Sequence, residues 1–328
     1  MNRRSEILVG GLAALGLGLL IFDSKTALVA ARDGIQLCVY TLVPTLLPFF
    51  FLSNLLTGVL MGREIKLLQP LGVLCRIPKG AEYILVAGFL GGYPLGAQCI
   101  SQACESGSLS NRDGRRMLAF CNNCGPAFLF GVAGTLFQDS NVPWILFTIH
   151  LISAFIVGVI LPGEPSRCMP RKSKSPSAVQ ALWQSIKGLA SVCGWVVLFR
   201  VLLSILDRWL LWYLPPILCA TIHGIFELAN GCINLSTITD PQIRFVLCSA
   251  VLSFGGLCVM MQTHSVASKV DRNLYFPGKV LQTCISLTLA CLLSVPKWAI
   301  YPGAVAFLIG FFLRARENKC RNPQKLVV

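Results

Sequence analysis

Apolar residues in this chain gather in long stretches, which short polar, basic or proline-rich stretches separate. In the first half the apolar stretches cover 7–22, 35–61, 83–100, 127–137 and 143–161. In the second half they cover 188–206, 209–235, 243–263, 278–295 and 298–313. The longer ones approach the roughly 20 residues that a helix needs to cross the hydrocarbon of a bilayer. We therefore predict an all-α, polytopic helical membrane protein with about eight to ten membrane segments, some of them only half-spanning.

The start of the chain allows two interpretations. Basic residues, an apolar stretch and a run of small residues within 1–31 resemble a cleaved signal peptide. Asp23 and Lys25 interrupt the approach to a cleavage site, so we expect an uncleaved first span instead. A short interfacial helix over 27–34 would follow, and two prolines predict a kink in 35–61.

Two apolar stretches are interrupted by a glycine pair with a glutamine six residues later, in copies 164 residues apart. The copies read Gly91-Gly92-Tyr93-Pro94-Leu95-Gly96-Ala97-Gln98 and Gly255-Gly256-Leu257-Cys258-Val259-Met260-Met261-Gln262. At this offset six identities fall within the 24 positions from Gly91 to Gly114, where chance gives roughly one or two. We predict two homologous halves, related as an inverted repeat, each with a broken or re-entrant helix.

Glycine pairs in membrane helices have two interpretations. Small residues allow close helix packing, and paired helix breaks in two halves mark a solute site near the bilayer midplane. The recurring glutamine favours the second, because broken helices expose backbone groups that a side-chain amide satisfies or presents to a ligand. The predicted gate comprises Gly91, Gly92, Tyr93, Pro94, Gln98, Gly255, Gly256 and Gln262.

A second candidate element lies between the two glycine pairs. Ser110 with Asp113 resembles a capping box and predicts a helix start, while Gly125-Pro126 predicts its end. Asn122 and Asn123 would then lie at the C-terminal end of this helix. They either complete a helix C-terminus or bind a polar solute at a helix break.

Charged residues inside the apolar stretches are the third group of candidates. Glu227 lies four residues after His223, on the same face of an uninterrupted helix. An acid in a membrane span is a functional candidate, and Asn230 lies close to it in sequence. Arg200 is the other intramembrane charge. It either serves structure, by pairing with Glu227 or by snorkelling to the interface, or takes part with Glu227 in solute or proton handling.

Composition narrows the class of protein. Hydrophobic residues make up 55% of the 328, charged residues 13%, and the mean hydropathy is +0.69, whereas a soluble domain carries about 25% charge. The fifteen cysteines lie mostly singly in apolar stretches, as small buried hydrophobes do. No catalytic set, metal-ligand spacing or phosphate-binding loop is recognisable, so we predict no enzyme activity, no metal and no cofactor.

The net charge of +14 comes from 28 Lys and Arg against 14 Asp and Glu. Because the basic residues lie between apolar stretches, they indicate orientation and lipid contact rather than nucleic-acid binding. We predict a multi-pass cell-membrane protein with both termini in the cytoplasm. The predicted parts are an N-terminal membrane half (1–161), a basic proline-rich linker (162–180), a C-terminal membrane half (181–313) and a basic tail (314–328).

Four blocks of sequence together resemble the YlbJ-type sporulation integral membrane proteins. They are Ala87–Ala97, Leu118–Pro126, Glu227–Gly231 and Phe254–Gly256. That resemblance implies a nucleoside-recognition, or Gate, domain, which is shared in outline with concentrative nucleoside and ferrous-iron transporters. It also implies a role in spore-envelope maturation and a gating role for 91–98 and 255–262. Cys124 and Arg200 depart from the family pattern, so the Arg200–Glu227 pairing rests on the residues alone.

Two functions fit these observations. The first is a transporter or permease for a small polar solute, of which a nucleoside is one candidate, with Asn122, Asn123, Glu227 and Asn230 contacting the solute. The second is a non-transporting membrane component of a spore-envelope assembly. Besides the lipid bilayer and the solute, a second copy of the chain and other sporulation membrane proteins are partner candidates.

Overall fold

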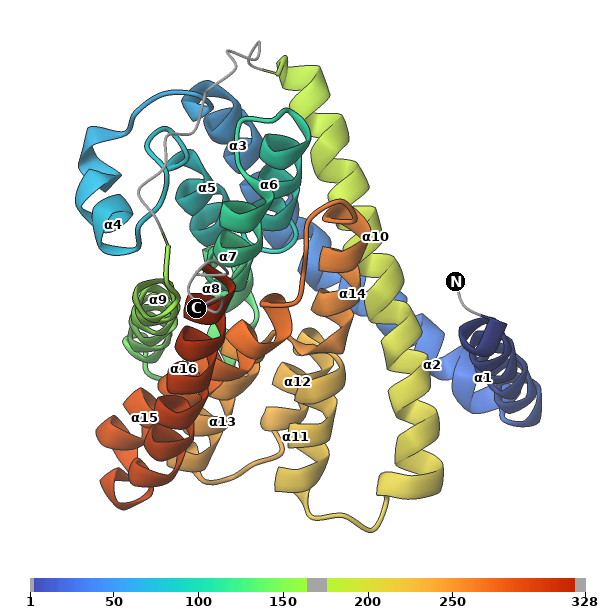
Figure 1. The fold of residues 1–328 in the computed structure, drawn as a ribbon. Helices are drawn as coiled ribbons and strands as arrows, with labels where there is room; N and C mark the ends of the chain where they lie inside the picture. Colours follow the sequence, from blue (N-terminus) through green and yellow to red (C-terminus); the bar gives the residue numbers. More distant parts are fainter. Residues whose placement is uncertain (1–2, 164–175, 322–328) are drawn as a thin grey trace.

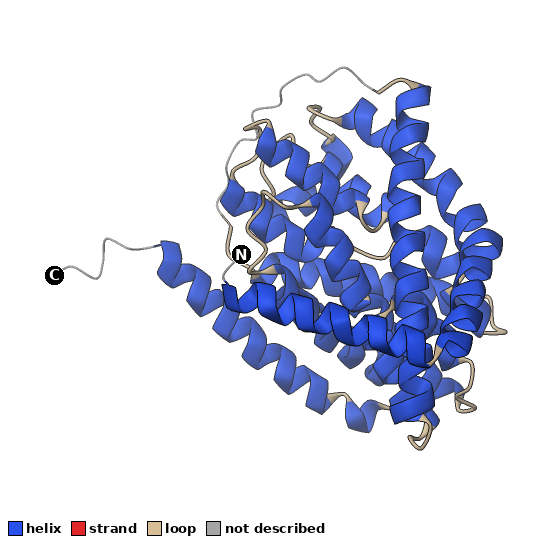
Figure 2. Ribbon diagram, turned by 90° about the vertical axis from the view of Figure 1, so that its right-hand side faces the viewer, coloured by secondary structure: helices blue, strands red, loops and turns tan. Residues whose placement is uncertain are grey.

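The protein is helical throughout the part that the computed structural model describes, residues 3–163 and 176–321 (Figure 2). Six helices in this part are long and apolar enough to cross a membrane: Ser24–Leu60, Val142–Ile160, Ala178–Leu211, Pro241–Val266, Tyr275–Ser294 and Pro296–Asn318. The prediction of an all-α polytopic membrane protein is confirmed. Most of the predicted linker and the end of the predicted tail lie outside the described residues, whereas 314–321 continue the last helix.

Two long helices pack against each other after the first helix, α1 (Arg3–Phe22) (Figure 1). One consists of α2 (Ser24–Leu37), a π-helical turn (Cys38–Leu42) and α3 (Val43–Leu60); the other is α10 (Ala178–Leu206) with a second π-helical turn (Asp207–Leu211). The predicted short helix over 27–34 is part of the longer helix α2, and its interfacial position stays a prediction. Residues 27–34 belong to the long helix that continues through α3. Gly34 lets this helix approach α10 closely, since an added Cβ would lie 3.1 Å from Val197 Cα.

Two helical hairpins follow the long helices in sequence. The first contains α5 (Tyr83–Val86), a π-helical turn (Ala87–Gly91) and α6 (Leu95–Glu105), and a short helix, α4 (Gln69–Leu74), precedes it. The second consists of α11 (Pro216–Phe226) and α12 (Leu228–Leu235). Close backbone contact joins the arms of each: an added Cβ at Gly96 would lie 3.0 Å from Gly88 Cα, and one at Gly231 would overlap Gly224 Cα.

After each hairpin comes a helix that breaks and then continues. The first broken helix consists of α7 (Asn111–Cys121) and α8 (Pro126–Gly131), and the second of α13 (Pro241–Phe254) and α14 (Gly256–Val266). The capping box at Ser110 is confirmed as an N-cap that accepts the Asp113 N–H. The predicted end of this helix at Gly125-Pro126 is wrong by four residues, because Pro126 opens α8, where its missing N–H costs nothing.

The two halves share one order of elements: a long helix, a hairpin, a broken helix and an uninterrupted span. These spans are α9 (Val142–Ile160) and α15 (Tyr275–Ser294), and α16 (Ile300–Arg321) follows α15. In Figure 1 the α11–α12 hairpin enters from the bottom, whereas α6 joins α7 through a loop at the top. Opposite entry is what an inverted repeat requires, and the inverted repeat stays a prediction.

The 164-residue offset pairs positions on unlike elements. Gly91-Gly92 forms the tip of the first hairpin, whereas Gly255-Gly256 breaks the second broken helix. Both glycine pairs occur because these helix breaks need left-handed backbone, with φ of 74° at Gly92, 79° at Gly255 and 85° at Gly256. By element order, Gly92 corresponds to Glu227 instead.

The first hairpin packs directly on the end of α7. Its two arms meet the carbonyl oxygen of Cys121, which a Cβ at either Gly88 or Gly96 would overlap. All three residues are buried. The absence of side chains at these two positions is therefore what allows the hairpin to close on the first broken helix.

Replacing Gly88 by Ala should destabilise the fold by about 3 kcal/mol or more, because the new methyl group meets rigid backbone. The measurement is thermal unfolding of the purified protein in detergent. Gly194→Ala in α10 is the matched control, since an added Cβ there meets nothing within 4 Å. Equal stability of the two variants would contradict the predicted packing.

Candidate functional site

The tips of the two hairpins and the interruptions of the two broken helices are four helix breaks, and they meet at one place in the molecule. A Cβ added at Gly92 would lie 2.6 Å from Gly125 N, which joins the first hairpin to the first broken helix. The break of the second broken helix contacts both hairpins. A Cβ added at Gly255 would lie 2.9 Å from the Tyr93 hydroxyl, and one added at Gly256 would lie 3.2 Å from Glu227 N. The breaks therefore form a continuous cluster.

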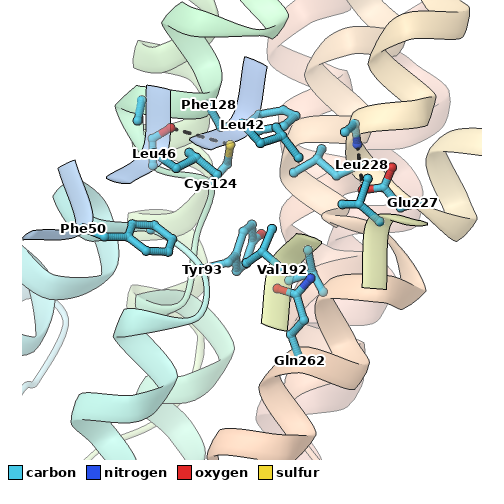
Figure 3. A pocket seen from close by; sticks show the side chains of 17 residues that line it. Leu42, Leu46, Phe50, Tyr93, Cys124, Phe128, Val192, Glu227, Leu228 and Gln262 are labelled. Carbon is cyan, nitrogen blue, oxygen red and sulfur yellow. Dashed lines mark hydrogen bonds between the residues drawn. The ribbon is translucent and has the colours of Figure 1, made fainter. Parts of the chain in front are cut away.

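A small cavity of about 50 Å³ lies at this cluster, between the breaks and the two long helices (Figure 3). Both hairpins, both broken helices and both long helices contribute to its lining, which consists of Leu42, Leu46, Phe50, Gly91, Gly92, Tyr93, Cys124, Gly125, Ala127, Phe128, Val192, Val196, Glu227, Leu228, Ala229, Val259 and Gln262. The long helices contribute only apolar side chains. Every polar side chain of the lining comes from a hairpin or a broken helix.

The cavity combines aromatic rings with a few polar groups. Phe50, Tyr93 and Phe128 supply the rings, and Glu227 and Gln262 the charge and the amide. Within the described residues the buried Tyr93 hydroxyl has no hydrogen-bond partner, and the Gln262 amide donates only to Cys258 Sγ, at 3.2 Å. This composition is typical of a small-molecule site, whereas the volume of about 50 Å³ is well below the roughly 300 Å³ at which such sites begin.

Glu227 forms the tip of the second hairpin and is almost completely buried. Its side chain caps α12 by accepting the N–H groups of Ala229 (2.9 Å) and Asn230 (2.6 Å), and it also accepts Asn230 Nδ2 at 2.8 Å. A carboxylate at a helix N-terminus is favoured by the unpaired N–H groups and by the helix dipole. Glu227 therefore holds the hairpin tip in shape beside the cavity.

The predicted pairing of Arg200 with Glu227 is wrong. Arg200 donates to Asn230 Oδ1 (3.2 Å) and lies 3.7 Å from Asp33 of α2, so it reaches Glu227 only through Asn230. His223 and Glu227 also do not share a helical face, because α11 ends at Phe226.

His223 contacts Asp207 at 2.7 Å and Asn234 at 2.7 Å instead. No local signal marks the break at Glu227, since neither glycine nor proline occupies it.

The two asparagines between α7 and α8 do not line the cavity, although both are fully buried. Asn122 accepts Ala97 N (3.2 Å) and donates to Thr263 Oγ1 (2.9 Å) and the Tyr275 hydroxyl (3.1 Å). It thereby joins the first hairpin, both broken helices and α15. Asn123 accepts hydrogen bonds from Lys279 and Gln282. Both amides are thus occupied by protein groups.

The predicted gate residues are divided between two places. Gly91, Gly92, Tyr93 and Gln262 line the cavity, with Pro94, Gly255 and Gly256 buried in the adjoining breaks. Gln98 lies apart from them, in a second groove between α3, α6 and α10, whose polar lining includes Asn54, Gln102, Gln180 and Gln184. The two glutamines of the repeated motif therefore face different spaces.

Sequence reasoning missed Lys279, a completely buried lysine in the first turns of α15. The signal was a lysine directly after Gly278, at the start of an apolar stretch, where a charge is usually taken as the end of a span. Among the described residues no group of three metal-binding side chains occurs.

Removal of the Glu227 side chain should lower stability by about 2–3 kcal/mol, because it leaves buried N–H groups of α12 without an acceptor. The comparison is Glu227→Ala against Asp240→Ala, which removes the exposed cap of α13 and should cost about 1 kcal/mol. Unfolding temperatures in detergent measure both. A smaller loss at Glu227 than at Asp240 would contradict the proposed role of this cap.

In sequence the chain resembles a membrane protein of sporulation. The chain is 26% identical to the sporulation integral membrane protein YlbJ of Bacillus subtilis over 321 aligned positions, which cover 83% of this chain and 78% of the relative. No family model and no solved structure matches the chain. The resemblance to YlbJ-type proteins is confirmed, whereas the Gate domain stays a prediction.

Proposed function

We propose that this YlbJ-like chain is a permease-like membrane protein that binds a small polar solute in the cavity at the four helix breaks. The observation that carries this proposal is the convergence of two hairpins and two broken helices on one cavity. Helix breaks inside a bilayer are tolerated where they face protein or a polar space. In transporters such breaks in corresponding parts of two halves surround the substrate.

The distribution of polarity around the cavity suggests which part carries the solute. The wall formed by the long helices is apolar, with Leu42, Leu46 and Phe50 on one helix and Val192 and Val196 on the other. Such a wall offers no directional contact to a polar solute. We propose that the hairpins and broken helices hold the solute and move past this wall to expose it to either side.

The solute class follows from the groups that the cavity offers. Aromatic rings suit a planar or apolar face, while Tyr93, Glu227 and Gln262 supply a few polar contacts. A buried carboxylate disfavours an anion unless a cation pairs with it. We therefore propose a neutral or cationic solute, of which a nucleoside is a candidate. The breaks must move apart to admit a solute of that size, because the cavity measures about 50 Å³. The name of the relative suggests that this protein acts during sporulation.

Uptake into proteoliposomes tests the proposal, with radiolabelled uridine and adenosine as the first probes. Gln262→Ala should lower uptake at least about tenfold, since the loss of one hydrogen bond of about 1.4 kcal/mol corresponds to tenfold in binding. Gln98→Ala, on the second groove, is the matched control and should transport normally.

A role in an assembly is the alternative function. Equal uptake by the two glutamine variants would contradict the proposed site. If neither probe enters proteoliposomes and neither binds to the protein in detergent, nucleoside transport is wrong. If, in addition, substitutions in the basic linker 163–177 abolish sporulation while Gln262→Ala does not, the assembly function replaces permeation.

A further inference from the structure

Lys279 is a buried charge with no acidic partner in the described chain. Its side chain has no exposed surface, and none of the ion pairs among residues 3–163 and 176–321 includes it. A buried charge is costly unless polar groups replace the water that it loses. Its surroundings must therefore be arranged to hold a cation.

Two amide oxygens and two aromatic rings surround the ammonium group. Lys279 Nζ donates to Asn123 Oδ1 at 3.0 Å and to Gln282 Oε1 at 2.9 Å. The centroids of the Tyr93 and Tyr275 rings lie 5.3 Å and 6.0 Å from Nζ, within the range of cation–π attraction. Oxygen dipoles and π faces together replace the missing carboxylate.

The amide oxygens are held in place by further hydrogen bonds. Asn123 Nδ2 donates to Phe120 O at 2.6 Å, and Gln282 Nε2 donates to Asn123 Oδ1 at 3.1 Å and to His150 O at 3.5 Å. Asn123 Oδ1 therefore accepts hydrogen bonds from both Gln282 and Lys279, while Gln282 Oε1 faces the ammonium group. The C-terminal end of α7, two residues before Asn123, adds the negative end of a helix dipole.

We propose that Asn123, Gln282, Tyr93 and Tyr275 form a preorganised binding site for a primary ammonium group, and that the side chain of Lys279 occupies this site. The site joins the first hairpin through Tyr93, the first broken helix through Asn123 and α15 through Gln282. The Lys279 ammonium thus fixes the hairpin tip to the rest of the fold from behind the cavity. This role does not depend on transport.

The ligand class follows from the donor set. A sodium or other hard metal ion takes most of its ligands from oxygen, and this site supplies two amide oxygens and two π faces. Aromatic faces recognise organic ammonium ions. A small alkylammonium should therefore bind in preference to sodium once the lysine side chain is removed.

Lys279→Ala creates such a vacant site, because the atoms removed beyond Cβ correspond to n-propylammonium. The experiment measures the unfolding temperature in detergent while n-propylammonium chloride is added at constant ionic strength. The unfolding temperature of Lys279→Ala should fall below that of the wild type and rise saturably, by about 3 °C or more, with n-propylammonium. Sodium chloride and uncharged 1-propanol should give less than half of this rise.

Two comparisons make the result specific. The wild-type protein, whose site is occupied, should not respond, and neither should Ser249→Ala, which removes a buried hydrogen bond to Ser286 elsewhere on α15. If n-propylammonium gives no rise, or 1-propanol or sodium gives an equal one, the proposal is wrong. An equal response of Ser249→Ala would also overturn it.

The proposal remains testable if Lys279→Ala does not fold without a ligand. Purification in the presence of n-propylammonium should then recover the variant, whereas 1-propanol should not. Failure to recover it, combined with wild-type stability of the uncharged Lys279→Met, would show that the position requires volume rather than charge. The readout is stability alone, so failure here leaves the uptake experiment unaffected, and failed uptake leaves this one unaffected.

Discussion

The need to satisfy backbone N–H and C=O groups away from water governs this structure. Each helix break frees such groups in the interior, and the groups that satisfy them come from another break or from a cap. Asn122 accepts the N–H of Ala97, and Glu227 accepts the first N–H groups of α12. The first bond joins the first hairpin to the first broken helix, the second pair lies within the second hairpin, and the cavity forms where these breaks meet.

This arrangement divides the molecule into two parts with different surfaces. The pair of long helices presents aliphatic and aromatic side chains to the cavity, whereas the hairpins and broken helices present the polar groups. Apolar contacts have no preferred direction. The polar contacts between the two parts include Arg200 with Asn230 and Asp207 with His223, and a change of position must break them or carry the second hairpin along with α10. The relative motion that the proposed permeation requires must therefore take one of these two courses.

Much of the fold could be predicted from the sequence, because glycine pairs, caps and apolar stretches are local signals. The breaks at Gly92 and Gly255 and the helix start at Ser110 are examples. The distinction between a hairpin and a broken span could not be predicted, since it depends on where the chain goes after the break. The partners of Arg200 and the burial of Lys279 are also set by distant segments, as is the separation of Gln98 from Gln262 into different spaces.

The contact of Gly88 and Gly96 with the Cys121 carbonyl limits how the first hairpin can move. Turning either arm about its own axis by one residue, about 100° in a helix, would bring a side chain against that oxygen. The hairpin and α7 therefore behave as one rigid lever, without internal rotation.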